Sequence, residues 1–298
     1  MKNYLRTAAA AIALAATPLL SHAAVDIVFD YSYDSSGFFA DASRMSILEQ
    51  AAGDIEARLT NETWTALTPG GMNSLKLNFF DPGNFYGSSV LVTNPLIAAD
   101  TLRIYVGATD LTDGSLGVAS VGYGYGGDAS WFNQVNERLN SATNYDPVGG
   151  SITFDAAPDG SSWYFGASAP QGGDSYDFYS VAVHEIFHIL GFGTSNAFDQ
   201  DVSDLSFVGE HVQGLMGGPV ALYNDGHWAE RLVYDGQVPV MVPALANGQR
   251  RYATELDYAA LADIGYTVTP VPEPMHGVLL LAGLPLVASF ARRRRQAA

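Results

Sequence analysis

The hydrophobic pattern of the chain predicts a mixture of strands and helices. Runs rich in β-branched and aromatic residues, which are typical of strands, occur at residues 25–31, 74–80, 102–107 and 151–155. After the first run, apolar residues recur near one face of a predicted helix that is capped by Asp41 or Ser43 and ends near Leu59. Together with the helices described next, these elements predict an α+β fold.

Two further helices are predicted in the second half of the chain. Residues 176–190 contain no proline or glycine and are apolar throughout, which predicts a mostly buried helix that stops at Gly191. A last helix is predicted over residues 254–264, with Thr254 as its cap and Gly265 as its stop.

Two histidines and a glutamate lie within one turn of the buried helix. His184 and His188 are four positions apart, so their side chains share a face, with Cβ atoms about 5–6 Å apart. That separation lets two ring nitrogens bind one zinc ion at about 2.0–2.1 Å. Glu185 lies beside these ligands and can take a proton from a zinc-bound water, which makes it the candidate general base. The pattern is H-E-x-x-H, and its alternative is a core helix whose histidines hydrogen-bond to neighbouring groups.

A catalytic zinc site of this kind needs a third protein ligand. Two of the six histidines lie in the terminal segments described below, which leaves His211 and His227 as candidates besides the helical pair. We favour His227, because it follows the turn-forming sequence Asn-Asp-Gly, which can present a side chain inward. His211, with Met216 nearby, is the alternative. Asp199 and Asp201 are weaker candidates, because a carboxylate would lower the positive charge of the site.

The two ends of the chain differ from its body. Residues 1–23 combine two basic residues with a short apolar run and small residues at positions 21 and 23, which is typical of an export signal cleaved before Ala24. Residues 271–298 contain Val-Pro-Glu-Pro, an apolar stretch and four arginines. This stretch is shorter than the roughly 20 residues that span a bilayer unaided, but the arginines would hold the C-terminus on the cytoplasmic side. Residues 24–270 remain as one catalytic domain, long enough to bury a full core.

Charge and cysteine content narrow the function further. Residues 24–270 carry 30 of the 31 acidic side chains but only 8 of the 14 basic ones, a formal charge of −22. Without a basic surface, the protein is not expected to bind nucleic acid. The acidic balance favours solubility, and Ca²⁺ is a further, weaker candidate ligand. The chain has no cysteine, so its stability depends on its core rather than on disulfides.

Two glycine-containing segments resemble ligand-binding loops but have simpler interpretations. Residues 122–127, a run of glycine and tyrosine, lack the strand-turn-helix context of a phosphate loop and predict a flexible surface loop. Residues 155–160 lack the ligand spacing of a calcium loop and predict a turn.

The active-site pattern resembles that of the metzincin metalloproteases. It continues from His188 to Gly191, and Met241 lies further on, where the resemblance implies a methionine turn that packs under the metal. The usual third histidine, three positions past the glycine, is replaced here by Thr194. Some metzincins place a transition-state-stabilising tyrosine two residues after this methionine, and the present chain has Pro243 there.

A subgroup, the leishmanolysin-like metzincins, brings the third histidine from a distant insert. The pair His227-Trp228, the later methionine and the sequence Leu-Ala-Asp-Ile-Gly-Tyr at residues 261–266 are similar to that arrangement. The resemblance covers roughly residues 151–268. It implies a mixed β-sheet over the active-site helix, a smaller C-terminal subdomain that begins near residues 191–194, and a cleft between them.

The tail resembles the PEP-CTERM sorting signal of bacteria with an outer membrane. The ordered triplet of Val-Pro-Glu-Pro, short hydrophobic segment and arginine cluster carries the resemblance over residues 271–298. It implies that a membrane protease removes the tail after export and leaves the protein in the cell envelope or outside the cell. A permanent C-terminal anchor is the alternative, and membrane contact is expected only through this tail.

Two classes of function are consistent with these features. The favoured one is an exported zinc endopeptidase that hydrolyses a peptide or protein substrate, with Glu185 as general base. Its zinc ion would be held by His184, His188 and His227. The alternative is a surface or matrix-binding protein with a structural or vestigial metal site. The first is preferred, because a structural site has no use for a glutamate between its ligands.

Overall fold

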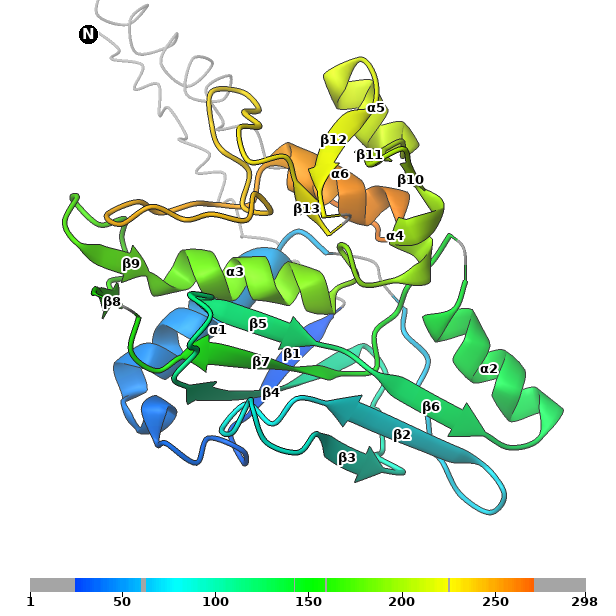
Figure 1. Cartoon of the computed structure of the whole chain (residues 1–298). Coiled ribbons are helices and arrows are strands. Elements are labelled where there is room, and N and C mark those ends of the chain that lie inside the picture. Colours follow the sequence, from blue (N-terminus) through cyan, green and yellow to red (C-terminus); the bar gives the residue numbers. More distant parts are fainter. Residues whose placement is uncertain (1–24, 60–62, 142, 159, 225, 271–298) are drawn as a thin grey trace, which may run out of the picture.

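The computed structural model describes residues 25–59, 63–141, 143–158, 160–224 and 226–270 (Figure 1). The predicted export signal and sorting tail, residues 1–23 and 271–298, lie outside the described residues. Within the described part of the chain, no helix has the length and hydrophobicity that a membrane crossing requires. The elements form a mixed α+β fold, as the sequence predicted.

One four-stranded sheet is mainly parallel. Its strands are β1 (Asp26–Asp30), β4 (Thr101–Thr109), β7 (Gly150–Asp155) and β5 (Gly117–Ser120), in the order β1-β4-β7-β5. β1, β4 and β7 are parallel, whereas β5 runs antiparallel to β7 at the edge. Every residue of β7 is buried, as expected for a strand covered on both faces. The strands predicted at residues 25–31, 102–107 and 151–155 are thus confirmed.

Two long helices lie side by side against this sheet (Figure 1). α1 (Ala42–Glu56) follows the short helix η1 (Phe38–Ala40) and begins at the predicted cap, where the Asp41 carboxylate accepts a hydrogen bond from the Ser43 N–H. It ends three residues before Leu59, which is buried beyond the helix. α3 (Phe178–Ile189) is buried along almost its whole length and contacts α1, β5 and β7.

A second sheet contains the glycine and tyrosine run at residues 122–127. Its order is β3 (Val90–Thr93), β2 (Ser74–Phe79), β6 (Tyr123–Gly126), and α2 (Ala129–Leu139) follows β6 along the chain. β2 confirms the strand predicted at residues 74–80. The prediction of a flexible loop was wrong, because β6 pairs antiparallel with β2.

Glycine and tyrosine both contribute to this pairing. A Cβ atom at Gly122 would lie 2.5 Å from the carbonyl oxygen of Asn78, so only glycine permits so close an approach of the two backbones. The Tyr123 hydroxyl donates a 3.1 Å hydrogen bond to the Leu139 carbonyl oxygen at the end of α2. The tyrosine thereby joins β6 to the helix that follows it.

Two short parallel strands, β8 (Ser162–Tyr164) and β9 (Ser175–Asp177), precede α3. Between β7 and β8 the chain makes the predicted turn, with a 3.0 Å hydrogen bond from the Ser161 N–H to the Pro158 carbonyl oxygen. The Asp155 carboxylate at the start of this turn accepts hydrogen bonds from the N–H groups of Leu111 and Ala157. It is thus already bound to the backbone.

The chain after Gly191 lies on the other side of α3 from the sheet (Figure 1). Its elements are short: α4 (Asn196–Gln200), β10 (Val202–Ser203), β11 (Ser206–Phe207), α5 (Glu210–Met216), β12 (Val220–Tyr223), β13 (His227–Trp228) and α6 (Glu255–Asp263). The four strands form an antiparallel sheet in sequence order. α6 confirms the last predicted helix, with Thr254 as its cap.

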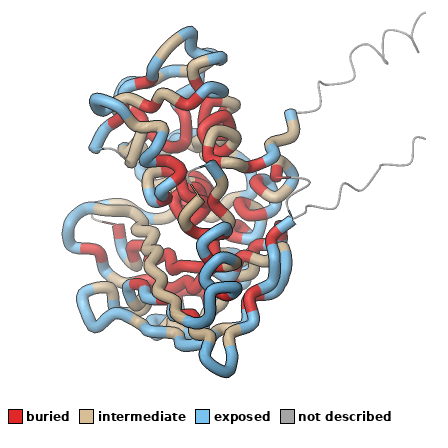
Figure 2. The backbone as a smooth tube through the Cα atoms, turned by 90° about the vertical axis from the view of Figure 1, so that its right-hand side faces the viewer, coloured by how far each residue is buried: buried red, intermediate tan, exposed pale blue. Residues whose placement is uncertain are grey.

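One hydrophobic cluster extends through the regions on both sides of α3. It includes Ile152 of the large sheet, Phe187 of α3 and Leu261 of α6. Figure 2 shows the same continuity, with buried residues in the lower and upper parts of the molecule and in the narrower part between them. α3 is therefore held between two packed layers, which fix the positions of its side chains.

Candidate metal centre

Both ends of α3 are fixed by specific contacts. At its start, the Asp177 carboxylate accepts hydrogen bonds from the N–H and hydroxyl group of Ser180 and pairs with the Arg250 guanidinium at 2.8 and 3.0 Å. At its end, Gly191 has a φ angle of 107°, and a Cβ atom there would lie 2.6 Å from the Tyr145 ring. Glycine is therefore required at the predicted stop, and the register of the helix is set from both ends.

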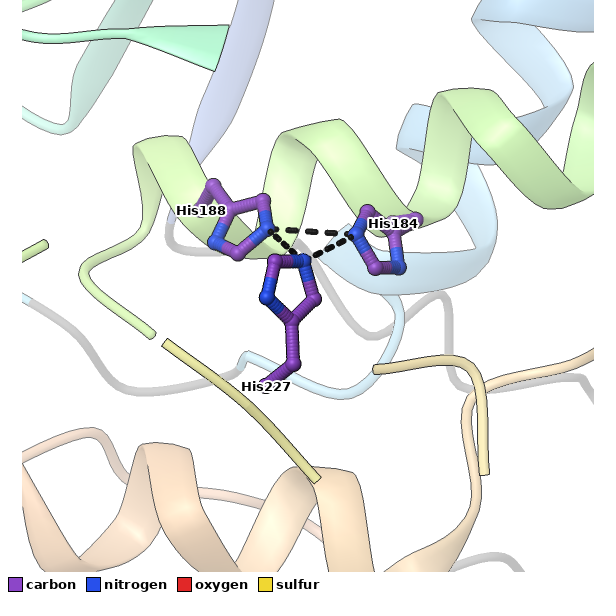
Figure 3. Close-up of side chains that lie close together, drawn as sticks. All are labelled: His184, His188 and His227. Atoms are coloured by element: carbon purple, nitrogen blue, oxygen red, sulfur yellow. Dashed lines mark hydrogen bonds between the residues drawn. The ribbon is translucent and has the colours of Figure 1, made fainter. Parts of the chain in front are cut away.

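Three histidine side chains meet beside this helix (Figure 3). The Nε2 atom of His184 lies 3.1 Å from that of His188 and 3.1 Å from that of His227, and the last two atoms are 3.2 Å apart. Tetrahedral zinc bonds of about 2.0–2.1 Å place nitrogen ligands about 3.3 Å from one another. The three nitrogen atoms therefore have the separation that one zinc ion requires.

Backbone carbonyl groups fix the protonation of two of these rings. The Nδ1 atom of His184 lies 2.8 Å from the Val240 carbonyl oxygen, and that of His188 lies 2.8 Å from the Phe192 carbonyl oxygen. A carbonyl oxygen only accepts hydrogen bonds, so each Nδ1 atom carries the proton and each Nε2 atom presents a lone pair. Lone pairs that face one another repel. A cation bound between them would be attracted to each lone pair and would remove this repulsion.

The electrostatic surroundings keep all three rings neutral, which is the form that binds metal. Burial, together with the two neighbouring histidines, holds the pKa of His184 well below its ordinary value. Burial lowers the pKa of His188 to about 4 and also lowers that of His227. Neutral imidazoles are thus expected well below neutral pH.

Glu185 lies beside the histidine cluster but is not part of it. Its side chain is only 5% exposed and packs against the edge strand β5, where the backbone of Ala119 donates a hydrogen bond to its carboxylate. A Cβ atom at Gly117 would lie 3.0 Å from Oε1 of Glu185, so the glycine makes room for this carboxylate. Burial raises the pKa of Glu185 to about 8. A cation bound by the histidines would lower it again.

A cavity of about 710 Å³ opens in front of these groups. The histidines and Glu185 line it from α3 and β13. Gly117, Val118 and Ala119 line it from β5, and Val242, Pro243 and Arg251 line it from the segment between β13 and α6. This volume is in the range of sites that enclose a small ligand or a few residues of a peptide.

The two candidates for a third ligand have different environments. His227 lies on β13, paired with Tyr223 of β12, and its ring reaches the pair on α3. His211 is exposed on α5, and its Nδ1 atom lies 2.8 Å from the Asp263 carboxylate. The cluster therefore does not include His211, the alternative ligand proposed together with Met216. Asp199 and Asp201 also lie outside the cluster.

Met241 is completely buried next to the site. Its carbonyl oxygen accepts a 3.0 Å hydrogen bond from the Trp228 N–H, and the residue before it, Val240, holds His184. The segment around Met241 is thus hydrogen-bonded both to β13, the strand that carries His227, and to the ring of His184.

Asp257 supports this arrangement, and sequence reasoning did not identify it. Its buried carboxylate accepts hydrogen bonds from Nε1 of Trp228 and from the N–H groups of Val240 and Met241. It also accepts hydrogen bonds from the N–H and hydroxyl group of Thr254. The bond from the Thr254 N–H and the reverse bond from the Asp257 N–H to the Thr254 hydroxyl oxygen form the capping box of α6. The spacing Thr254-x-x-Asp257 is the sequence signal that was available, but it indicates only the cap.

Replacement of Asp257 by Asn is expected to lower the free energy of unfolding by about 2–3 kcal/mol. Asn keeps one acceptor oxygen, but its NH2 group takes the place of the second carboxylate oxygen. The N–H groups that donated to that oxygen are then buried without an acceptor. Urea denaturation of the full-length protein measures the change. The exposed Asp199→Asn variant is the control, with a change below about 0.5 kcal/mol. Equal stability of the two variants would contradict the role given to Asp257.

Comparison of the chain with protein-family models, with curated proteins and with solved structures found no match.

Proposed function

We propose that the protein is a zinc-dependent endopeptidase. The observation that carries this proposal is the convergence of three Nε2 atoms at 3.1–3.2 Å, two of them with lone pairs directed by carbonyl groups. Three histidines with an open fourth position facing a cavity are typical of catalytic rather than structural zinc sites. Zinc bound there would polarise a carbonyl group and acidify water.

Glu185 supplies the proton transfer in this proposal. It lines the same cavity as the histidines and does not belong to their cluster, so it remains free to accept a proton. We infer that its carboxylate takes the proton of the attacking water and passes it to the leaving amine. Its burial against β5 keeps bulk water away from the carboxylate and fixes the orientation of the carboxylate toward the cavity.

A peptide substrate is favoured by the strand that borders the cavity. β5 pairs with β7 on one side only, and among the described residues no strand pairs with its other side. Gly117 and Ala119 of this strand line the cavity. An extended peptide can add to such an edge through main-chain hydrogen bonds, which would place it across the front of the histidines.

The wider proposal follows the resemblance to leishmanolysin-like metzincins. In this proposal residues 24–270 form the catalytic domain, the region beyond residues 191–194 is the C-terminal subdomain, and Met241 forms the floor beneath the metal. The protein is exported by residues 1–23, and a sorting protease removes residues 271–298.

Metal analysis and a cleavage assay on the same full-length sample test the proposed function. One zinc ion per chain is expected, together with hydrolysis of a peptide library that a chelator abolishes and added zinc restores. A chain that binds zinc stoichiometrically and cleaves no peptide would support the alternative, a binding protein with a structural metal site.

Met241→Leu is expected to fold and to retain part, but not all, of its kcat/KM. Leucine has nearly the same volume, and such replacements lower the free energy of unfolding by less than about 1.5 kcal/mol, so the variant should fold. The backbone contacts of residue 241 with Trp228 and Asp257 do not depend on its side chain. Peptide hydrolysis by the zinc-loaded variant measures the effect, with the 82% exposed Met72 changed to Leu as control. Activity equal to that of the control would show that Met241 is an ordinary core residue.

A further inference from the structure

The cavity beside the histidines contains one fixed positive charge, that of Arg251. Among the residues that line the cavity, Arg251 is the only arginine or lysine. The chain as a whole carries a formal charge of −17. A guanidinium group inside the cavity of so acidic a protein is a local feature and not an extension of a basic surface.

Hydrogen bonds hold Arg251 between the first turn of α3 and the segment that follows β13. Its N–H donates to the Ser180 hydroxyl oxygen over 2.7 Å, and its Nη1 donates to the Val242 carbonyl oxygen over 2.9 Å. The preceding residue, Arg250, is fixed by its ion pair with Asp177, and both of these side chains are almost completely buried. Because Ser180 and Val242 also line the cavity, the guanidinium is preorganised beside the space that a substrate would occupy.

No ion pair neutralises the charge of Arg251 in the described part of the chain, and the buried Asp257 carboxylate acts on it only through space. Four ion pairs occur among the described residues, and none of them includes this arginine. Its Nε atom is buried without a hydrogen-bond partner in the described part of the chain. By contrast, Arg250 directs both Nε and Nη2 at one carboxylate. The Asp257 carboxylate already accepts hydrogen bonds from other groups, so Arg251 has no directly paired anion, and a ligand that supplied one would stabilise this partly buried cation.

On the basis of the hydrolytic function proposed above, we propose that Arg251 selects substrates that carry an acidic side chain next to the scissile bond. A carboxylate complements a guanidinium group in both charge and geometry, and the partial burial of the pair would strengthen it. Arg251 and His184 line the same cavity.

Cleavage of a peptide library by the zinc-loaded full-length protein tests this selectivity. Mass spectrometry of the products is expected to show Asp or Glu enriched at one of the two positions that flank the cleaved bond. The enrichment is expected to disappear in Arg251→Gln and to persist in Arg103→Gln, a control that removes the same charge from strand β4. For a matched pair of peptides with Glu or Gln at that position, the kcat/KM ratio is expected to fall from about 10 to about 1 in Arg251→Gln.

Binding provides a second measurement that does not depend on turnover. In a Glu185→Gln background, fluorescence anisotropy of the same labelled peptide pair is expected to give about tenfold tighter binding of the Glu peptide. The Arg251→Gln change is expected to abolish this difference. If that variant does not fold, Arg251→Lys replaces it. Lysine keeps the positive charge but lacks the planar guanidinium that binds a carboxylate through two hydrogen bonds, so only part of the preference is expected to remain.

The possible outcomes separate this inference from the proposed function. Cleavage without acidic enrichment would overturn the role of Arg251 and leave the endopeptidase proposal intact. An equal loss of activity on the Glu and Gln peptides in Arg251→Gln would assign the guanidinium to the reacting carbonyl group instead. Absence of cleavage by a zinc-loaded chain would overturn the proposed function, and the selectivity with it.

Discussion

Replacement of Glu185 by Gln is expected to leave one zinc ion bound and to lower kcat/KM for peptide hydrolysis by about 10²–10⁴-fold, the contribution typical of a general base. Gln has the shape of Glu and can still accept the hydrogen bond from the Ala119 backbone, so the helix and its neighbours should not move. It cannot accept a proton from water. Zinc should be retained, because the residue lies outside the cluster of three histidines.

Two measurements on the same sample check this expectation. Zinc content by mass spectrometry is expected to remain at one per chain, while the initial rate on a quenched-fluorescence peptide falls. Glu210→Gln is the matched control, because it removes the same charge from an exposed position at the start of α5. Unchanged hydrolysis by a zinc-replete Glu185→Gln variant would exclude the general-base role.

The second large effect is expected at His227. Loss of its imidazole leaves two nitrogen ligands on α3, and two ligands cannot fill the protein side of a catalytic zinc site. Removal of an outer hydrogen-bond partner already lowers metal affinity by about 10–100-fold, so loss of a ligand itself is expected to lower zinc affinity by more than about 100-fold. Peptide hydrolysis should be lost with the metal.

His211→Ala is the matched control for His227→Ala. The Asp263 carboxylate still accepts hydrogen bonds from the N–H groups of residues 211 and 212 in that variant, so α5 should keep its start. Competition with a chromophoric chelator measures zinc affinity for both full-length variants. Stoichiometric zinc in a folded His227→Ala protein, combined with loss of zinc from His211→Ala, would reverse the assignment and transfer the methionine turn to Met216.

Local features were the most predictable from sequence. The pattern around His184, Glu185 and His188 defines its own geometry, because the spacing of residues on a helix follows from the helix alone. Caps at Asp41 and Thr254 are likewise local, and both are present. The principal strands also followed from composition, since runs of β-branched and aromatic residues are rarely stable outside a sheet.

Features that depend on distant partners were less predictable. Residues 122–127 have a loop-like composition, and only the proximity of β2 makes them a strand. Asp257 acts on residues 16–29 positions away, and Arg251 is held by a residue 71 positions away, so neither role leaves a pattern within one element. The position of His227 was inferred from its neighbours in sequence, but its distance to the helical pair depends on the whole C-terminal region.

The position of Asp257 also bears on the order in which the site forms as the chain is synthesised. Because synthesis proceeds from the N-terminus, the helix with His184 and His188 leaves the ribosome before the strand with His227, and Asp257 follows later still. Until Asp257 arrives, the N–H groups of Val240 and Met241 and the indole N–H of Trp228 have no carboxylate to hold them. The metal-binding geometry is therefore completed only when α6 has folded, and a nascent or truncated chain that ends before Asp257 carries the histidines without the support that aligns them.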